Sequence, residues 1–560
     1  MTPAPAAPDL ITLEILHNAL RSVVDESFIA LMKSAYSTNI KERHDHSTAL
    51  MDRRGRLVAQ AEFSLPIHLS SMMGMMAVVM RKYPPGTLRE GDILVGNDPY
   101  ASGGTHLPDV GLVMPIFVGG RHIGFVANIA HHADMGGMAP GSMAGGMTEI
   151  YQEGLRIPVI HLFRSGVLVQ DVLDLLLLNQ RVPEERRGDY FAQVAACRIG
   201  ERRLGELAAQ YAPDTLEAAF DAIITRTEAR LRGAFAAIPA GTYAAEDVMD
   251  DDGLAARDLP IRCRITVGDG RMRLDFTGTA RQVPGNINCT LNATQAAVTY
   301  TLKALLDPDV PNNQGVLDAI DIVTESGTIV DCAFPASTAA RAHVCQRIVD
   351  VIIRALADAI PQRVVAAANG ANTTAVFTGT DPRNGRPYVY LETLGGGFGG
   401  RATKDGKDGV QVHITNTSNL PVEAIESEYP LIVESYTLVA DSGGAGQHRG
   451  GLALRRVVRP LGHVAVFSGH GERFRHAPWG LFGGADGASG RFALRRPDGS
   501  EEELNPKPLG VAFGPEERIV MQTPGAGGYG PPDARDAEAL ARDRRSGKFS
   551  AAYLARHYGR

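Results

Sequence analysis

Three side chains in the first quarter of the chain are of the types that bind divalent metals. His106 and Asp109 stand three residues apart in GNDPYASGGTHLPDV, and His131 follows in NIAHHADMGG, at the end of an apolar run. Two imidazoles and one carboxylate can hold Fe, Mn or Zn while leaving coordination positions open for water or substrate. A metal held in this way polarises a carbonyl, holds an enolate oxygen or acidifies a water. The spacing therefore predicts a catalytic metal site formed by His106, Asp109 and His131.

These residues also have a purely structural interpretation. Histidine, aspartate and glycine in loops often cap helices and bond to turn backbones, and spacing alone leaves the two interpretations open. The neighbouring His132 adds a second ambiguity. Because adjacent residues on a strand face opposite sides, only one of the two histidines is expected to ligate, and we favour His131.

Further acidic residues stand close to this motif in the sequence. They are Asp98 in NDPY, Asp134 in HHADMGG and Glu153 in YQEGLRIP. A carboxylate beside a metal site can orient a ligand imidazole or transfer a proton, so we predict catalytic roles of this kind for all three. A fourth group, Glu42, His44, Asp45 and His46 in KERHDHSTALMD at residues 41–52, could reach an active site, but we favour its interpretation as a solvated turn before a strand.

Several other kinds of site are not indicated by the sequence. The glycine-rich stretch LGGGFGGRATKDGKDG lacks the G-x-x-x-x-G-K-[ST] pattern of a phosphate loop, so no nucleotide site is predicted in this chain. Ser442 has no G-x-S-x-G motif around it, which argues against a serine hydrolase. The five cysteines show no C-x-x-C spacing and are interpreted as buried thiols.

The elements that must position the metal site can be inferred from apolar periodicity. Helical spacing predicts an amphipathic helix from Leu10 to about Ser37, and short apolar runs from Thr48 to Ala130 predict strands around THLPD. The fold class expected is mixed α/β (α+β) and multi-domain, with β-rich regions around the metal loop and in the C-terminal part and a helical module near 170–240. Four parts are expected: a metal-site region with the helical module at 1–240, a mixed α/β domain at 241–390, a Gly-rich, β-rich region at 391–530 and a helical tail at 531–560.

Composition narrows the classes of partner. The chain has 560 residues and a formal net charge of −7, without the basic surface that nucleic acids require. Its start, MTPAPAAPDL, does not resemble a signal peptide, and two aspartates interrupt its most apolar run, GVLVQDVLDLLLLNQ. We therefore expect a cytoplasmic protein with no nucleic-acid or membrane partner.

Several long motifs also carry a resemblance to a known family. In matching order, and over nearly the whole chain, they resemble the hydantoinase B/oxoprolinase family. KERHDHS departs slightly from the Asp-Phe-Ser usual in that family. The motifs that carry the resemblance are IKERHDHSTALMD, GRLVAQAEFSLPIHLSSM, GNDPYASGGTHLPDV, AHHADMGG, YQEGLRIP, DFTGTARQVPGNIN, PNNQG, EYP and DSGGAGQHRGG.

The resemblance implies an activity and a partner. It implies a B-type subunit that works with a hydantoinase A-type ATPase subunit in an A2B2-like hetero-oligomer, with ATP bound by the partner. It also implies a divalent metal (Mn, Zn or Fe) on a His-x-x-Asp motif and a downstream His, which fall on His106, Asp109 and His131. The expected reaction is ATP-dependent opening of a small cyclic amide such as a hydantoin, oxoproline or a lactam. The alternatives are a subunit of an ATP-dependent ketone carboxylase of the acetone or acetophenone type, and a non-catalytic scaffold.

Overall fold

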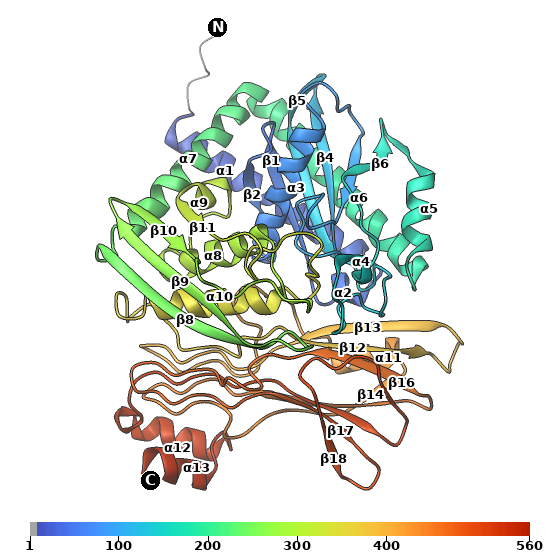
Figure 1. Cartoon of the computed structure of the whole chain (residues 1–560). Coiled ribbons are helices and arrows are strands. Elements are labelled where there is room, and N and C mark those ends of the chain that lie inside the picture. Colours follow the sequence, from blue (N-terminus) through green and yellow to red (C-terminus); the bar gives the residue numbers. More distant parts are fainter. Residues whose placement is uncertain (1–7, 560) are drawn as a thin grey trace.

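The computed structural model describes residues 8–559, which fold into layers of helices and sheets (Figure 1). The N-terminal part is built on a seven-stranded sheet of order β2-β1-β5-β4-β3-β6-β7. Its strands are β1 (His46–Asp52), β2 (Leu57–Gln60), β3 (Ile93–Gly96), β4 (Asp109–Val118), β5 (Arg121–His131), β6 (Ile160–Arg164) and β7 (Val167–Leu168).

Helices cover both faces of this sheet. One face packs against α1 (Leu10–Ser34), α6 (Pro183–Tyr211) and α7 (Pro213–Phe235), and the other against α3 (His68–Lys82). Burial on both faces explains why β4 is a continuous apolar run with no polar alternation. The Asp9 carboxylate accepts hydrogen bonds from the first backbone amides of α1, and a proline begins each of α6 and α7.

The central part of the chain packs beside this sheet. A four-stranded sheet of order β11-β10-β9-β8 shares one apolar core with two helices. The elements are β8 (Gly241–Asp251), β9 (Arg257–Gly268), β10 (Arg271–Asp275), α8 (Leu291–Leu306), β11 (Ile320–Val323) and α10 (Ala342–Ala355). The N-terminal and central parts also contain the short helices α2 (Thr38–Lys41), α4 (Ile150–Glu153) and α9 (Gln314–Asp318).

The C-terminal part is rich in strands, drawn in orange and red in Figure 1. One sheet has the order β13-β12-β16-β19 and the other β14-β15-β20-β17-β18. The strands are β12 (Thr373–Thr380), β13 (Pro387–Leu394), β14 (Leu431–Leu438), β15 (Leu454–Pro460), β16 (Ala465–His470), β17 (Arg491–Arg495), β18 (Glu501–Leu504), β19 (Val511–Phe513) and β20 (Arg518–Gln522). The helices are α11 (Val422–Glu428), α12 (Ala537–Arg545) and α13 (Ala551–Tyr558).

The fold class expected from the sequence is confirmed. The helical module contains α5 (Gln170–Leu178) with α6 and α7, and strands dominate around the THLPD loop and in the C-terminal part. All five cysteines are buried free thiols, as predicted. No helix within residues 8–559 combines the length and apolarity that crossing a membrane requires.

Candidate metal centre

Three side chains from adjacent strand ends meet in the interior of the N-terminal part. The Asp109 Oδ1 atom lies 2.8 Å from Nε2 of His106 and 3.2 Å from Nδ1 of His131. One possible ligand atom from each residue lies within 4.8 Å of the others, and all three residues are buried. We call these three residues the triad.

The sheet itself creates this meeting point. β4 begins at Asp109 and β5 ends at His131, and the two residues are direct partners in the antiparallel ladder. His106 reaches the same point from the preceding loop, where Gly103 has a positive φ of 73° and its backbone touches that of Gly74 on α3. A Cβ at Gly103 would lie 2.3 Å from that backbone, so the loop can approach the helix only with glycine there.

Arg341 and Thr105 hold the other side of the Asp109 carboxylate. The Arg341 Nη2 atom lies 2.6 Å from Asp109 Oδ2, and Arg341 Nε donates a hydrogen bond of 3.1 Å to Thr105 Oγ1. Burial acts to raise the pKa of Asp109, but the neighbouring His106 ring and Arg341 guanidinium outweigh it and hold the pKa well below its usual range. The carboxylate is therefore ionised, with Oδ2 fixed by arginine and Oδ1 facing the two imidazoles.

His106 is held in the state that a metal ligand requires. Burial and the nearby positive charge of Arg341 lower the pKa of His106 to about 4, so the ring is neutral near pH 7. Its Nδ1 lies 2.9 Å from the Ala339 carbonyl oxygen. Nδ1 also lies 3.1 Å from Nη1 of Arg341, which can only donate, so the first contact favours a proton on Nδ1 and the second favours a lone pair there. In either tautomer Nε2 faces Asp109 Oδ1 at 2.8 Å.

The Glu153 carboxylate orders the segment that carries this carbonyl. Its Oε1 accepts hydrogen bonds from Ser337 Oγ and from the backbone N–H groups of Thr338 and Ala339, the last at 2.8 Å. Burial raises the pKa of Glu153 to about 7 despite these bonds. Glu153 thus supports His106 through Ala339 and makes no direct contact with the triad.

The triad fits a divalent metal on the chemistry of its donors. The buried His131 Nε2 has no hydrogen-bond partner among residues 8–559, although buried polar atoms are normally bonded, and the buried His106 Nε2 faces the Asp109 carboxylate at 2.8 Å. His132 faces the other way, where its Nε2 lies 3.0 Å from Gln193 Oε1. Two imidazoles and a carboxylate suit Zn, Fe or Mn and leave positions open for water or substrate.

The space beside the triad is small. A cavity of about 30 Å³ is lined by the triad, Arg341, His68 and Asp45, among others. That volume is far below the roughly 300 to 1,000 Å³ typical of small-molecule sites. The side chains that line it must therefore move apart before a cyclic amide can reach the triad.

The interpretation of residues 41–47 as a solvated turn was wrong. Asp45 is buried and lines the triad cavity, and the Asp45 carbonyl oxygen accepts a hydrogen bond from the His131 backbone. His46 is fully buried, stacks on Phe28 at a ring distance of 4.0 Å and has its pKa lowered by burial to about 3. The segment is buried because β1 begins at His46 and pairs with β5 beside the triad.

The other two predicted acids, Asp98 and Asp134, form their contacts away from the triad. Asp98 forms an ion pair with Arg156 and accepts hydrogen bonds from the backbone of its own turn. Asp134 forms an ion pair with Arg181 at 2.8 Å and accepts hydrogen bonds from the Gly136 and Gly141 backbone. Both carboxylates stabilise loops next to the site and contact none of its three members.

Arg341 was absent from the sequence-based prediction, and its removal has a measurable consequence. Arg341→Met is expected to weaken binding of a divalent metal by about 10- to 100-fold, because the Asp109 carboxylate loses the group that orients it. Metal titration of the dialysed protein measures the change. The matched control is Arg354→Met, at an exposed position of α10, the helix that begins one residue after Arg341. This variant should bind the metal as the wild type does. Equal affinities in both variants would show that Arg341 does not support the triad.

Comparison with known proteins finds a matching family model, related sequences and a similar solved structure. Residues 9–532 match the family model of hydantoinase B/oxoprolinase. A protein of Methanocaldococcus jannaschii is 38% identical, over 98% of this chain and 96% of its own length. The putative B-type subunit of a D-/L-hydantoinase from a Pseudomonas species is 34% identical, over 96% of this chain and 92% of that protein. The crystal structure of ATP-dependent caprolactamase from Pseudomonas jessenii superposes with a TM-score of 0.94 at 28% identity, covering 99% of this chain and 96% of that one.

Proposed function

Since the chain belongs to the hydantoinase B/oxoprolinase family, we propose that it is the B-type subunit of an ATP-dependent enzyme that opens cyclic amides. Membership of this family confirms the resemblance found in the sequence motifs. The observation that carries the proposal is the buried triad, whose donors suit a catalytic metal with open positions. The names of two relatives, a putative hydantoinase and an ATP-dependent caprolactamase, support the choice of cyclic amides.

His106, Asp109 and His131 would hold the metal, which when bound polarises a carbonyl or activates a water. The protein supplies the remaining features of the site. Arg341 keeps Asp109 ionised and fixes Oδ2, and the Ala339 carbonyl oxygen lies 2.9 Å from His106 Nδ1 and positions the ring. The small cavity excludes bulk water around the triad, which strengthens every electrostatic interaction inside it. Asp45 also lines the cavity, and we propose its carboxylate as a group that accepts a proton from a substrate or water.

ATP would be used by a separate A-type ATPase subunit. An unactivated amide resists attack by water, and transfer of phosphate from ATP to its oxygen would make the carbonyl carbon more electrophilic. Water would then add to this carbon, the ring nitrogen would take a proton and leave as the C–N bond breaks, and hydrolysis of the resulting acyl phosphate would release phosphate. The sequence of this chain has no G-x-x-x-x-G-K-[ST] loop, so we assign the nucleotide to the partner. The assembly proposed is a hetero-oligomer of the two subunits.

Turnover by the two subunits together tests the function. The purified chain and its A-type partner are incubated with ATP and with hydantoin, oxoproline or caprolactam, and ring-opened product and ADP are measured. We expect ring opening that depends on ATP and on both subunits. The same panel includes ketones with labelled bicarbonate. Incorporation of the label without opening of any cyclic amide would replace the proposal by the ketone carboxylase alternative.

A further inference from the structure

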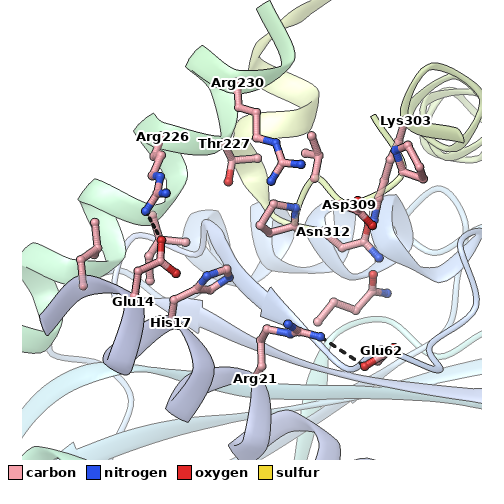
Figure 2. Close-up of a pocket in the computed structure, with 16 residues that line it drawn as sticks. Glu14, His17, Arg21, Glu62, Arg226, Thr227, Arg230, Lys303, Asp309 and Asn312 are labelled. Carbon is pink, nitrogen blue, oxygen red and sulfur yellow. Dashed lines mark hydrogen bonds and ion pairs between the residues drawn. The ribbon is translucent and has the colours of Figure 1, made fainter. Parts of the chain in front are cut away.

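Two neighbouring cavities lie outside the triad cavity, beside α1, α7 and α8. Their volumes are about 360 and 240 Å³, and both are lined by Glu62, Lys303, Pro308 and Asn312. The larger one alone falls within the range of 300 to 1,000 Å³, roughly, that is typical of small-molecule sites. Figure 2 shows the larger cavity, with charged side chains from all three helices directed toward it.

Four cationic side chains line the larger cavity, and three of them are in ion pairs. Arg21 pairs with Glu62 at 3.2 Å, Arg226 with Glu14, and Arg230 with Asp307 at 2.6 Å (Figure 2 shows the first two pairs). The arginines are 44%, 57% and 45% exposed. Exposed pairs of this kind stabilise a protein little, so an arginine can exchange its partner for a ligand carboxylate at small cost.

Lys303 differs from the three arginines. Its Nζ donates a hydrogen bond of 2.7 Å to the neutral Asn312 side chain, and no carboxylate of residues 8–559 lies within ion-pair distance of it. Burial lowers the pKa of Lys303 to about 8, although the nearby carboxylates of Asp307 and Asp309 act to raise it. An anion bound in the cavity would supply the missing partner.

Gln60 provides an independent sign of a ligand. It is only 6% exposed and lines the larger cavity. Neither the nitrogen nor the oxygen of its amide has a hydrogen-bond partner among residues 8–559. The large majority of buried side-chain polar atoms in proteins do have such a partner. A cis amide, as in a lactam ring, presents one N–H donor and one carbonyl acceptor side by side and can satisfy both atoms together.

We propose that these two cavities form a binding site for a small cyclic amide that carries a carboxylate. Gln60 pairs with the amide, Lys303 with the carboxylate, and the apolar part of the ring lies against Leu69 and Tyr300 in the smaller cavity. The choice of a cyclic amide rests on the proposed function. Residues 64–69, which run from a turn into α3, line both this site and the triad cavity, with Pro66 in the wall of the one and Leu65 in the wall of the other.

Equilibrium dialysis of the full-length chain, with its partner when the two co-purify, tests the site. The probes are 2-pyrrolidone-5-carboxylate, its ring-opened product glutamate, and 2-pyrrolidone, which lacks the carboxylate. We expect saturable binding of the first. Binding of 2-pyrrolidone should be weaker by about tenfold or more, the equivalent of one charge-assisted hydrogen bond. Binding of glutamate should also be weaker, because it lacks the amide that pairs with Gln60. Equal binding of 2-pyrrolidone, stronger binding of glutamate, or no saturable binding of any probe would overturn the proposal.

Two substitutions in the cavities and one at the triad locate the bound probe. Lys303→Met is expected to weaken binding by about tenfold or more, since it removes the charge and keeps most of the stem. Gln60→Leu removes the unpaired amide, so it should weaken binding while leaving the melting temperature unchanged or higher. His106→Ala should bind the probe as the wild type does. Loss of binding in His106→Ala, with none in the other two variants, would place the probe at the triad and overturn the proposal. Absence of metal and turnover, by contrast, would reject the proposed function and leave this binding result standing.

Discussion

His106→Ala and His131→Ala are each expected to lower the rate of ATP-dependent ring opening by about 10³-fold or more. The physical reason is that a metal with one protein ligand missing is lost or displaced, and its stabilisation of developing charge is worth several kcal/mol. Both histidines are buried, and the neighbouring imidazole of His68 lies 3.6 Å from Asp109 Oδ2, the oxygen that Arg341 already holds. Steady-state turnover of the variants with the A-type partner measures the loss.

His132→Ala is the matched control for these variants. It removes an equally buried imidazole one residue away, whose Nε2 lies beside Gln193 and whose pKa burial lowers to about 4. This variant should keep its metal and most of its turnover. Full activity after substitution of His106, Asp109 and His131 by alanine would instead support the scaffold alternative, in which the triad is only structural.

The second large effect is on stability, at a buried ion cluster in which two segments of the central part meet one segment of the C-terminal part. Arg473 Nη2 lies 2.7 Å from carboxylate oxygens of Asp247 on β8 and of Asp350 on α10. Burial alone would raise the pKa of Asp247, but Arg473 and Arg347 outweigh it and hold the pKa below its usual range. Arg473→Met leaves these buried carboxylates without their main partner. We expect the free energy of unfolding to fall by about 3–5 kcal/mol.

Urea denaturation of the wild type and the variant measures this change. The control is Arg273→Met, which breaks an exposed ion pair with Asp321 at 3.2 Å. Exposed pairs contribute about 0–1 kcal/mol, so this variant should unfold close to the wild type. Equal losses in the two variants would mean that burial of the Arg473 cluster adds nothing to stability.

The sequence predicted those parts of the site that depend on local pattern. Asp109 and His131 flank two apolar runs that are typical of strands, and antiparallel pairing of the runs brings the two residues together. The preference for His131 over His132 followed from the two-residue period of a strand, and in the structure only His131 faces Asp109. The long helices and the strands of the glycine-rich C-terminal part could also be predicted, because they too depend on local sequence pattern.

The remaining features depend on contacts between distant segments, which a single sequence does not encode locally. Arg341 is 232 residues from Asp109 and carries no motif of its own. The segment at residues 41–47 is polar, so it resembled a surface turn, and only the pairing of β1 with β5 buries Asp45 and His46. Proximity in sequence also favoured Asp98 and Asp134, whose carboxylates form ion pairs with Arg156 and Arg181 in nearby loops.

The metal content of the purified chain tests the central claim most directly. Elemental analysis of the wild type is compared with that of a His106→Ala, His131→Ala double variant, after dialysis against metal-free buffer. The account predicts about one Mn, Zn or Fe per wild-type chain and none in the double variant. Equal metal content in both proteins, together with equal turnover, would contradict it and leave THLPD as a structural loop.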